Sequence, residues 1–233
     1  MKNKRLTATI VIPVYNEEKG IDLCLNSIAI QTVMPNEVIV VDNNCTDKTI
    51  DIVKRYNFCK VVKETKQGRF AARNNGFRQV KTDLVCRIDG DSILPNNWLE
   101  TVLRVFEGDR YVGYTGGLYF YDKPFNKLST IIHKLVYFDL AKLIYGKQVF
   151  FGANMAFRAK FISYALGKSK DDNSYIHEDV DLSLAIAPKG RIKLITDNPV
   201  GVSFTKTAGS PSKLWRHLRM LFSYNKYRPI DRS

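Results

Sequence analysis

The sequence predicts an α/β protein built on a mostly parallel, Rossmann-like sheet with helices on both faces. Short, continuously apolar segments such as TATIVIPV (7–14) and EVIVVD (37–42) alternate with stretches whose apolar residues recur at helical spacing. Strands that are apolar along their whole length are typical of a parallel sheet covered on both faces. With 233 residues and 45% hydrophobic content, the chain can bury a sizeable core without disulfides.

Apolar periodicity predicts the elements of the first 106 residues. In chain order we expect strands at 7–14, 37–42, 59–64 and 83–89, and helices at 17–31, 45–56, 68–80 and 94–106. Pro95 suits the first turn of the last of these helices. Since ligands bind beyond the carboxyl ends of the strands in such sheets, the polar residues that follow each strand are candidates for a site.

The second half is less regular. We expect a strand at 111–121, an amphipathic helix at 127–146, a strand leading into a helix at 149–162, a helix opened by acidic residues at 177–186, β-structure at 191–204 and a basic amphipathic helix at 210–227. For the 127–146 helix we favour packing against the core over a surface role. No internal repeat or low-complexity linker divides the chain.

The charge predicts an anionic partner, because 36 Lys and Arg against 23 Asp and Glu give a net charge of +13. Nucleic acid, phosphate-bearing small molecules and an anionic membrane surface all fit this charge. Residues 206–233 hold seven Lys or Arg against one Asp, interleaved with Leu and a Trp. That pattern favours a helix that lies on a membrane surface over one that packs on the core.

Cysteine spacing and hydropathy predict the compartment. Four cysteines (Cys24, Cys45, Cys59 and Cys86) lack CxxC or metal-site spacing, so we expect reduced thiols and no zinc. The apolar stretch near the N-terminus is too short for a signal peptide, and no apolar run approaches the roughly 18 residues of a membrane span. We therefore expect a cytoplasmic protein, peripheral at the inner face of the membrane.

An Asp-Gly-Asp follows the strand expected at 83–89. In extended backbone the carboxylates of Asp89 and Asp91 lie on one face, where Mg²⁺ or Mn²⁺ would relieve their repulsion. Gly90 would let a bulky ligand approach the backbone. The alternative is a plain hairpin turn, which needs a strand on both sides, whereas ILPNNWLE reads as a helix start.

Five segments resemble one family when taken together. TIVIPVYNEE, EVIVVDNNCTDKT, KQGRFAARNNGF, DLVCRIDGDSILPNNWL and HEDVDLSL occur in the order and spacing of the family 2 glycosyltransferases with the GT-A fold, over about residues 7–186. The resemblance implies a glycosyltransferase domain over 1–205, with a nucleotide-binding half (1–106) and an acceptor-binding half (107–205). Residues 206–233 are the basic extension.

The resemblance also implies a nucleotide-sugar site and a divalent cofactor, Mn²⁺ or Mg²⁺. Asp91 would bind the metal, with Asp89 as a second ligand directed toward the ribose, and Asp42 would contact the base and ribose. Asn43 replaces the second Asp of the family's pair, and its amide oxygen can still accept a hydrogen bond from a uracil N–H. The remaining donor-binding positions implied are Pro13, Tyr15, Asn16, Glu17, Arg69, Arg73 and Gly90.

The catalytic pair implied by HEDVDLSL is Asp179 as general base, with Glu178 positioning it. Gly116, Gly117 and Asn154 would flank the acceptor. Each position has a plain structural alternative, namely turn capping, a solvated helix face, sheet packing or acids that favour a helix N-terminus. Their convergence on one sheet edge favours the site.

We therefore expect an inverting, metal-dependent, non-processive transferase that moves a sugar from a nucleoside-diphosphate sugar, UDP-sugar favoured, to a hydroxyl of a sugar, glycolipid or polyprenyl-linked acceptor. The alternatives are a polyprenyl-phosphate sugar transferase using a GDP- or UDP-sugar, a basic nucleic-acid-binding protein and a nucleotidyltransferase. The missing nucleic-acid motifs disfavour the second of these. The sequence leaves the sugar, the acceptor and the oligomeric state open.

Overall fold

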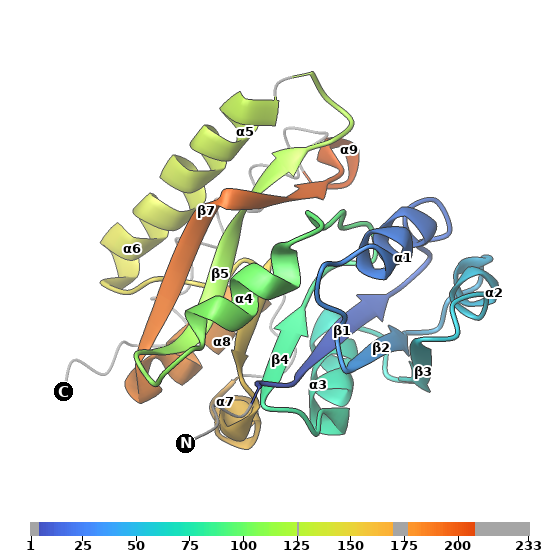
Figure 1. The fold of residues 1–233 in the computed structure, drawn as a ribbon, viewed down its shortest axis with the longest axis horizontal. Coiled ribbons are helices and arrows are strands. Elements are labelled where there is room, and N and C mark those ends of the chain that lie inside the picture. Colours follow the sequence, from blue (N-terminus) through green and yellow to red (C-terminus); the bar gives the residue numbers. More distant parts are fainter. Residues whose placement is uncertain (1–4, 125, 170–176, 208–233) are drawn as a thin grey trace.

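The fold is centred on one seven-stranded sheet. The computed structural model describes residues 5–124, 126–169 and 177–207 (Figure 1). The strands are β1 (Ala8–Val14), β2 (Glu37–Asp42), β3 (Cys59–Lys63), β4 (Leu84–Arg87), β5 (Tyr111–Phe120), β6 (Met155–Arg158) and β7 (Arg191–Val202), in the spatial order β3-β2-β1-β4-β6-β5-β7. Only β6 runs antiparallel to its neighbours β4 and β5; the other pairs are parallel. The predicted mostly parallel sheet is confirmed.

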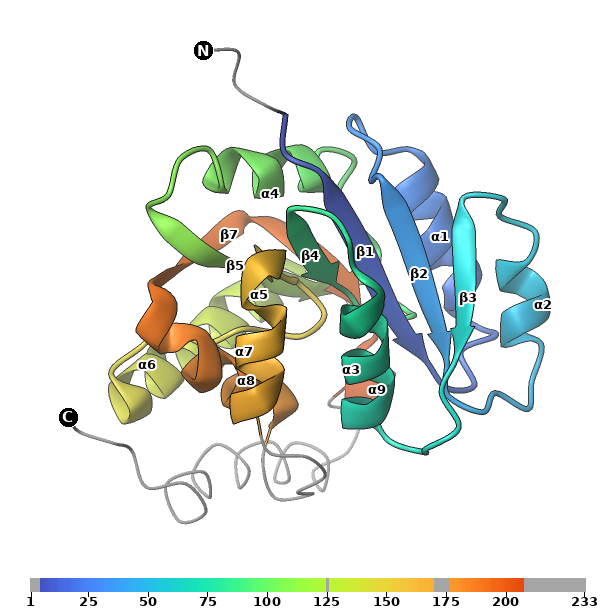
Figure 2. The same ribbon diagram turned by 90° about the horizontal axis from the view of Figure 1, so that it is seen from below.

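Helices cover both faces of the sheet. One face carries α1 (Ile21–Ala29), α2 (Thr49–Val53) and α4 (Trp98–Val105), and the other carries α3 (Arg69–Gln79), α7 (Ile162–Lys168) and α8 (Glu178–Ile186) (Figure 2). Successive side chains of a strand point to opposite faces. Accordingly, Ile10 and Ile12 of β1 join the cluster under α1, whereas Val11 joins the cluster under α3. The continuous apolar strands therefore supply two cores at once.

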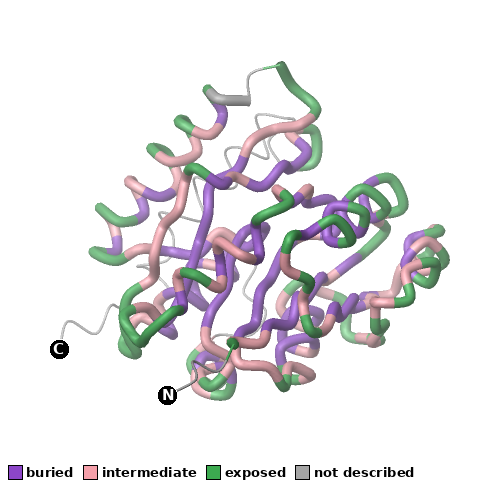
Figure 3. The backbone as a smooth tube through the Cα atoms, viewed as in Figure 1, coloured by how far each residue is buried: buried purple, intermediate pink, exposed green. Residues whose placement is uncertain are grey.

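One long helical segment lies beside β5 and β7 (Figure 1). It comprises α5 (Asn126–His133), a π-helical turn (Lys134–Asp139) and α6 (Leu140–Tyr145). Phe138, Ala141 and Tyr145 are buried in a third apolar cluster, whereas the outer side is exposed (Figure 3). The prediction that this helix packs on the core holds for one side only.

Several predicted boundaries were wrong. Helix α4 begins at Trp98, so Pro95 precedes it, and the Pro95 carbonyl accepts a hydrogen bond from Trp98 N–H (3.0 Å). The strand expected from residue 149 begins only at Met155. Strand β4 ends at Arg87, so Asp89 and Asp91 lie in the turn that follows it and not in extended backbone.

The C-terminal helix expected at 210–227 lies outside the described residues, which end with α9 (Phe204–Thr207). Among the helices that are described, none is long and apolar enough to span a membrane. All four cysteines are free, as expected.

Candidate functional site

Arg87 connects the two acidic motifs, which are separated by about 90 residues in the sequence. It is the last residue of β4 and its side chain is only 6% exposed. Its guanidinium lies 2.9 Å from Asp89 Oδ1, 3.0 Å from Glu178 Oε1 and 2.9 Å from Asp179 Oδ1. Burial works against the charge, but the three carboxylates raise the pKa of Arg87 well above its usual value. We call these four residues the Arg87 cluster.

Gly152 makes room for this cluster. Its N–H donates a hydrogen bond to Asp179 Oδ2 (2.9 Å). A Cβ atom at position 152 would lie 1.5 Å from an Arg87 terminal nitrogen and 2.5 Å from Asp179 Oδ1. Any larger residue must therefore displace the guanidinium that joins the two motifs.

The two acids at the start of α8 have different environments. Burial disfavours ionisation of Glu178, but Arg87 and Arg73 outweigh it and lower the pKa of Glu178. Burial raises the pKa of Asp179 to about 6, with Arg87 opposing and Glu178 adding to the rise. The side chain of Asp179 is also the more exposed, at 14% against 4%. A partly accessible carboxylate that ionises near neutral pH suits a general base.

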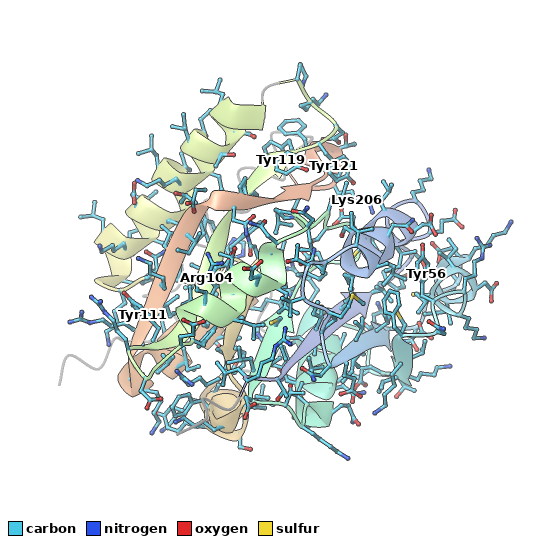
Figure 4. All side chains as sticks on the ribbon, in the orientation of Figure 1. Tyr56, Arg104, Tyr111, Tyr119, Tyr121 and Lys206 are labelled. Atoms are coloured by element: carbon cyan, nitrogen blue, oxygen red, sulfur yellow. The ribbon has the colours of Figure 1, made fainter. Side chains whose placement is uncertain are left out.

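Asp91 lies next to Lys206, a lysine that the sequence analysis did not single out. The side chain of Lys206, labelled in Figure 4, contacts Glu17 and places its Nζ 3.7 Å from Asp91 Oδ2. Burial and Asp89 raise the pKa of Asp91 to about 6, and Lys206 opposes that rise. The acids therefore do not all meet one cation: Arg87 contacts Asp89, Glu178 and Asp179, whereas Lys206 lies beside Asp91.

Asp122 fixes the segment that carries Lys206. Its carboxylate accepts hydrogen bonds from the N–H groups of Phe204 (2.7 Å) and Thr205 (3.1 Å) at the start of α9. These bonds lower the pKa of Asp122 to about 2 although burial opposes them. Phe204 also packs edge-on against Phe120, with ring centroids 5.0 Å apart.

Asp89 and Asp91 supply carboxylate oxygens of the kind that divalent metals bind. Within the described residues, no group of three or more His, Cys, Asp and Glu side chains is arranged to hold a metal. Asp89 and Asp91 nevertheless provide two adjacent carboxylates, one of which is 44% exposed, and their mutual repulsion raises the pKa of Asp91. Mg²⁺ and related ions commonly bind one or two carboxylates and complete their shell with substrate phosphates and water.

Asn43 has a structural role that the sequence did not predict. Its amide nitrogen donates hydrogen bonds to the carbonyls of Glu64 (3.1 Å) and Lys66 (2.8 Å), and its oxygen accepts one from Gly68 N–H (2.8 Å). The amide thereby holds the loop that leads into α3, and the contact of its oxygen with uracil stays a prediction. An aspartate could not donate these bonds. Its neighbour Asp42 accepts a hydrogen bond from Cys45 N–H (2.8 Å), which closes a turn.

The prediction that Arg73 contacts the donor is wrong. Its side chain is fully buried and lies under α8, where it donates a hydrogen bond to the Glu178 carbonyl (3.0 Å) and lies 3.8 Å from Glu178 Oε2. Arg73 therefore supports Glu178 from the interior of the protein. Arg69, one helical turn earlier, is exposed and stays a candidate for the diphosphate.

The predicted acceptor residues are internal. Asn154 is fully buried, accepts a hydrogen bond from Trp98 Nε1 (2.8 Å) and donates one to the Gly117 carbonyl (2.9 Å). A Cβ at Gly116 would lie 2.2 Å from the Asn154 amide nitrogen. These contacts support the alternative of sheet packing for Asn154 and Gly116, and the acceptor role of Gly117 stays a prediction.

Gly90 also serves packing. A Cβ there would lie 2.9 Å from Val14 Cγ1 and 3.1 Å from Glu17 Cγ, so the glycine is required by packing, and the approach of a ligand to its backbone stays a prediction.

The turn that follows β1, which was expected to contact the nucleotide, is open to solvent. Pro13 is half-buried, Tyr15 is 52% exposed and Asn16 is exposed in a left-handed conformation (φ 54°). Asn16 Oδ1 accepts a hydrogen bond from Thr46 N–H (2.8 Å), which joins the two strand-end loops.

Three contributors escaped the sequence analysis: Arg87, Gly152 and Lys206. A signal existed for Arg87, because an arginine two residues before Asp89 interrupts an apolar strand. Gly152 and Lys206 gave none, since their importance depends on neighbours far away in the sequence.

Comparison with known proteins identifies the family. The profile of Glycosyl transferase family 2 matches residues 9–165, more than half of the chain. Glycosyltransferase AglE of Haloferax volcanii is 35% identical over 107 residues, covering 43% of this chain and 35% of AglE. The dolichyl N-acetyl-alpha-D-glucosaminyl phosphate 3-beta-D-2,3-diacetamido-2,3-dideoxy-beta-D-glucuronosyltransferase of Methanococcus voltae is 27% identical over 232 residues, covering 88% of this chain and 68% of the relative.

Solved structures share the fold. The mannosyltransferase PcManGT of Pyrobaculum calidifontis, in complex with GDP-Man and Mn²⁺, superposes with a TM-score of 0.74 at 22% identity and covers 97% of this chain and 66% of its own. TarS of S. aureus in complex with UDP-GlcNAc gives 0.65 at 19% identity, covering 85% and 58%. The chain thus has the GT-A type of fold and spans only part of several relatives. From the profile match, we conclude that it is a glycosyltransferase and belongs to glycosyl transferase family 2.

Proposed function

We propose that the protein is an inverting, metal-dependent glycosyltransferase that transfers one sugar from a nucleoside-diphosphate sugar to a hydroxyl group. The observation that carries the proposal is the Arg87 cluster, which joins the Asp-Gly-Asp turn to the acidic start of α8. Asp89, proposed to face the nucleotide-sugar donor, and Asp179, proposed to face the acceptor, are thereby held at one edge of the sheet. This arrangement supports a direct, single displacement at the anomeric carbon of the sugar.

Asp179 is the proposed general base. As the acceptor hydroxyl attacks the anomeric carbon, the carboxylate takes its proton and the bond to the diphosphate breaks on the opposite side. Arg87 and the Gly152 N–H orient the carboxylate. Its pKa of about 6 leaves it ionised at neutral pH, and protonation removes the base as the pH falls below that value.

Asp91 and Asp89 are the proposed metal ligands. A bound Mn²⁺ or Mg²⁺ would supply positive charge to the departing diphosphate. Arg69 is exposed near this edge and is proposed to assist it. As donors we propose UDP-sugars first and GDP-sugars second; solved relatives hold one of each, UDP-GlcNAc in TarS and GDP-Man in PcManGT.

The proposed acceptor is a lipid-linked sugar or polyprenyl phosphate at the inner face of the membrane. The M. voltae relative, which aligns with most of this chain, is named for a dolichyl-linked acceptor. A single transfer is proposed, because KLWRHLRM (213–220) only partly resembles the Gln-rich Arg-Trp motif of processive family members.

The test compares Asp179→Asn with Asp109→Asn, a matched change at a 92% exposed carboxylate remote from the cluster. With Mn²⁺ and a nucleotide-sugar, Asp179→Asn should lower the transfer rate about 10²–10⁴-fold while nucleotide binding measured by calorimetry is unchanged. Asp109→Asn should match the wild type. Wild-type activity in Asp179→Asn, or a product whose NMR coupling shows retained anomeric configuration, would overturn the proposal.

A further inference from the structure

We propose that the α5–α6 helical segment binds the surface of an anionic membrane through its outer side. The outer face is defined as Leu128, Ile131, Ile132, Leu135, Val136 and Leu143. Its role in presenting a lipid-linked acceptor rests on the proposed function, whereas the binding itself does not.

The outer face concentrates large apolar side chains on one side of one helix. Leu143 is 82% exposed, and the other five are between 40% and 56% exposed. Positions 128, 131, 132 and 135 follow helical spacing, and positions 136 and 143 continue it seven residues apart. Single exposed leucines are normal on proteins, but a contiguous apolar stripe marks an interaction surface.

The opposite side of the same helix holds it firmly on the domain. Phe138, Ala141 and Tyr145 are buried against Val149 and Val180. Near the start of the helix, Thr130 Oγ1 donates a hydrogen bond to the Leu118 carbonyl (2.8 Å). The apolar stripe therefore projects from a fixed element, and its exposure is not a consequence of loose packing.

The charges beside the stripe identify the partner as an anionic surface. Residues 126–147 contain four lysines and a single acid, Asp139, which pairs with Lys134 (3.0 Å). Lys142 and Lys147 are exposed in and just beyond the last turn. An apolar face edged by lysines, on a chain of net charge +13, fits lipid tails bordered by acidic headgroups.

The inner side of the helix reaches the Arg87 cluster. Tyr137 donates a hydrogen bond to the Phe150 carbonyl (2.8 Å). Its ring centroid lies 6.4 Å from that of His177, which directly precedes Glu178. Burial raises the pKa of Tyr137, and the charge of Asp179 adds to the rise. A helix is only about 10 Å thick, so a membrane on the outer face would lie close to the proposed base. An acceptor whose sugar projects from the bilayer could then reach the site.

The test measures sedimentation of the full chain with sucrose-loaded vesicles, without any nucleotide-sugar. The variant Ile131→Glu/Leu135→Glu places two charges in the stripe. The matched control, Leu23→Glu/Ile30→Glu, alters one exposed apolar residue of α1 (50% exposed) and one that directly follows the helix (68% exposed). Circular dichroism and thermal melting check that both variants are folded.

We expect the wild type and the control to bind phosphatidylcholine vesicles containing a third phosphatidylglycerol, and the α5 variant to bind about tenfold more weakly. Binding should weaken with pure phosphatidylcholine and with added salt. Turnover on a soluble acceptor should be unchanged in the α5 variant.

Two results would overturn this inference. One is equal vesicle binding by the α5 variant and the wild type. The other is that the wild type does not bind vesicles and the α5 variant has a lower Tm or a changed oligomeric mass. In that case the stripe would be covered by residues 208–233 or by a second copy of the chain. An inactive protein that still binds vesicles through the stripe would contradict the proposed function alone.

Discussion

Replacing Arg87 by methionine should test whether one guanidinium holds the site together. The substitution keeps an apolar stem but leaves Glu178, 4% exposed, without its closest positive partner, and frees Asp89 and Asp179 from their 2.9 Å contacts. Removing one partner of a buried ion pair typically costs about 3–5 kcal/mol. This is a large part of the 5–15 kcal/mol that stabilises a typical domain, so Arg87→Met should unfold at a much lower urea concentration.

The control is Arg104→Ala, labelled at its position on α4 in Figure 4. That arginine pairs with Glu100 at 2.6 Å, but the two side chains are 68% and 41% exposed. An exposed pair at this helical spacing is worth about 0.3–0.5 kcal/mol, so the control should unfold nearly as the wild type does. If Arg87→Met also loses less than about 1 kcal/mol, the reasoning about the Arg87 cluster is wrong.

The pH dependence provides a second check on the same variant. Because the pKa of Glu178 is lowered in the folded protein, its pairing stabilises the fold above the ordinary glutamate range and this contribution is lost as the pH falls. The difference in unfolding free energy between wild type and Arg87→Met should therefore be full at pH 7 and shrink as the pH falls toward about 4. A difference that grows on acidification would contradict the assignment.

Three further changes test single contacts. Gly152→Ala should displace the Arg87 guanidinium and lower transfer at least about tenfold, measured as kcat with the fold checked by circular dichroism, and full activity would contradict the crowding. Lys206→Met should tighten the binding of Mn²⁺ about fivefold, because a cation 3.7 Å from Asp91 Oδ2 is lost. Calorimetry with Mn²⁺ alone at pH 7.5 measures this affinity, and weaker binding would assign the lysine a supporting role. Asn43→Asp should cost about 1–3 kcal/mol in urea unfolding, because its two donated hydrogen bonds are lost, and an unchanged midpoint would contradict the structural role.

Local patterns in the sequence determined the elements of the fold. Apolar runs and helical repeats depend on neighbours within a few residues, so the strands and helices of the first half lie where they were expected, with errors of a few residues at their ends. The rule that ligands bind beyond the carboxyl ends of parallel strands then directed attention to the Asp-Gly-Asp turn, whereas the acids of α8 were implied only by the resemblance of HEDVDLSL to the family. These predictions needed no knowledge of long-range contacts.

Tertiary structure alone decided which side chains those acids meet. Arg73 and Asn154 have types suited to ligand binding, yet both are buried and hydrogen-bonded within the protein. Conversely, Arg87 and Lys206 acquire their roles from carboxylates about 90 and more than 100 residues away. Sequence periodicity fixes the face of an element on which a residue lies, but the partner on that face depends on how distant elements pack, and so the chemistry of this site became visible only in three dimensions.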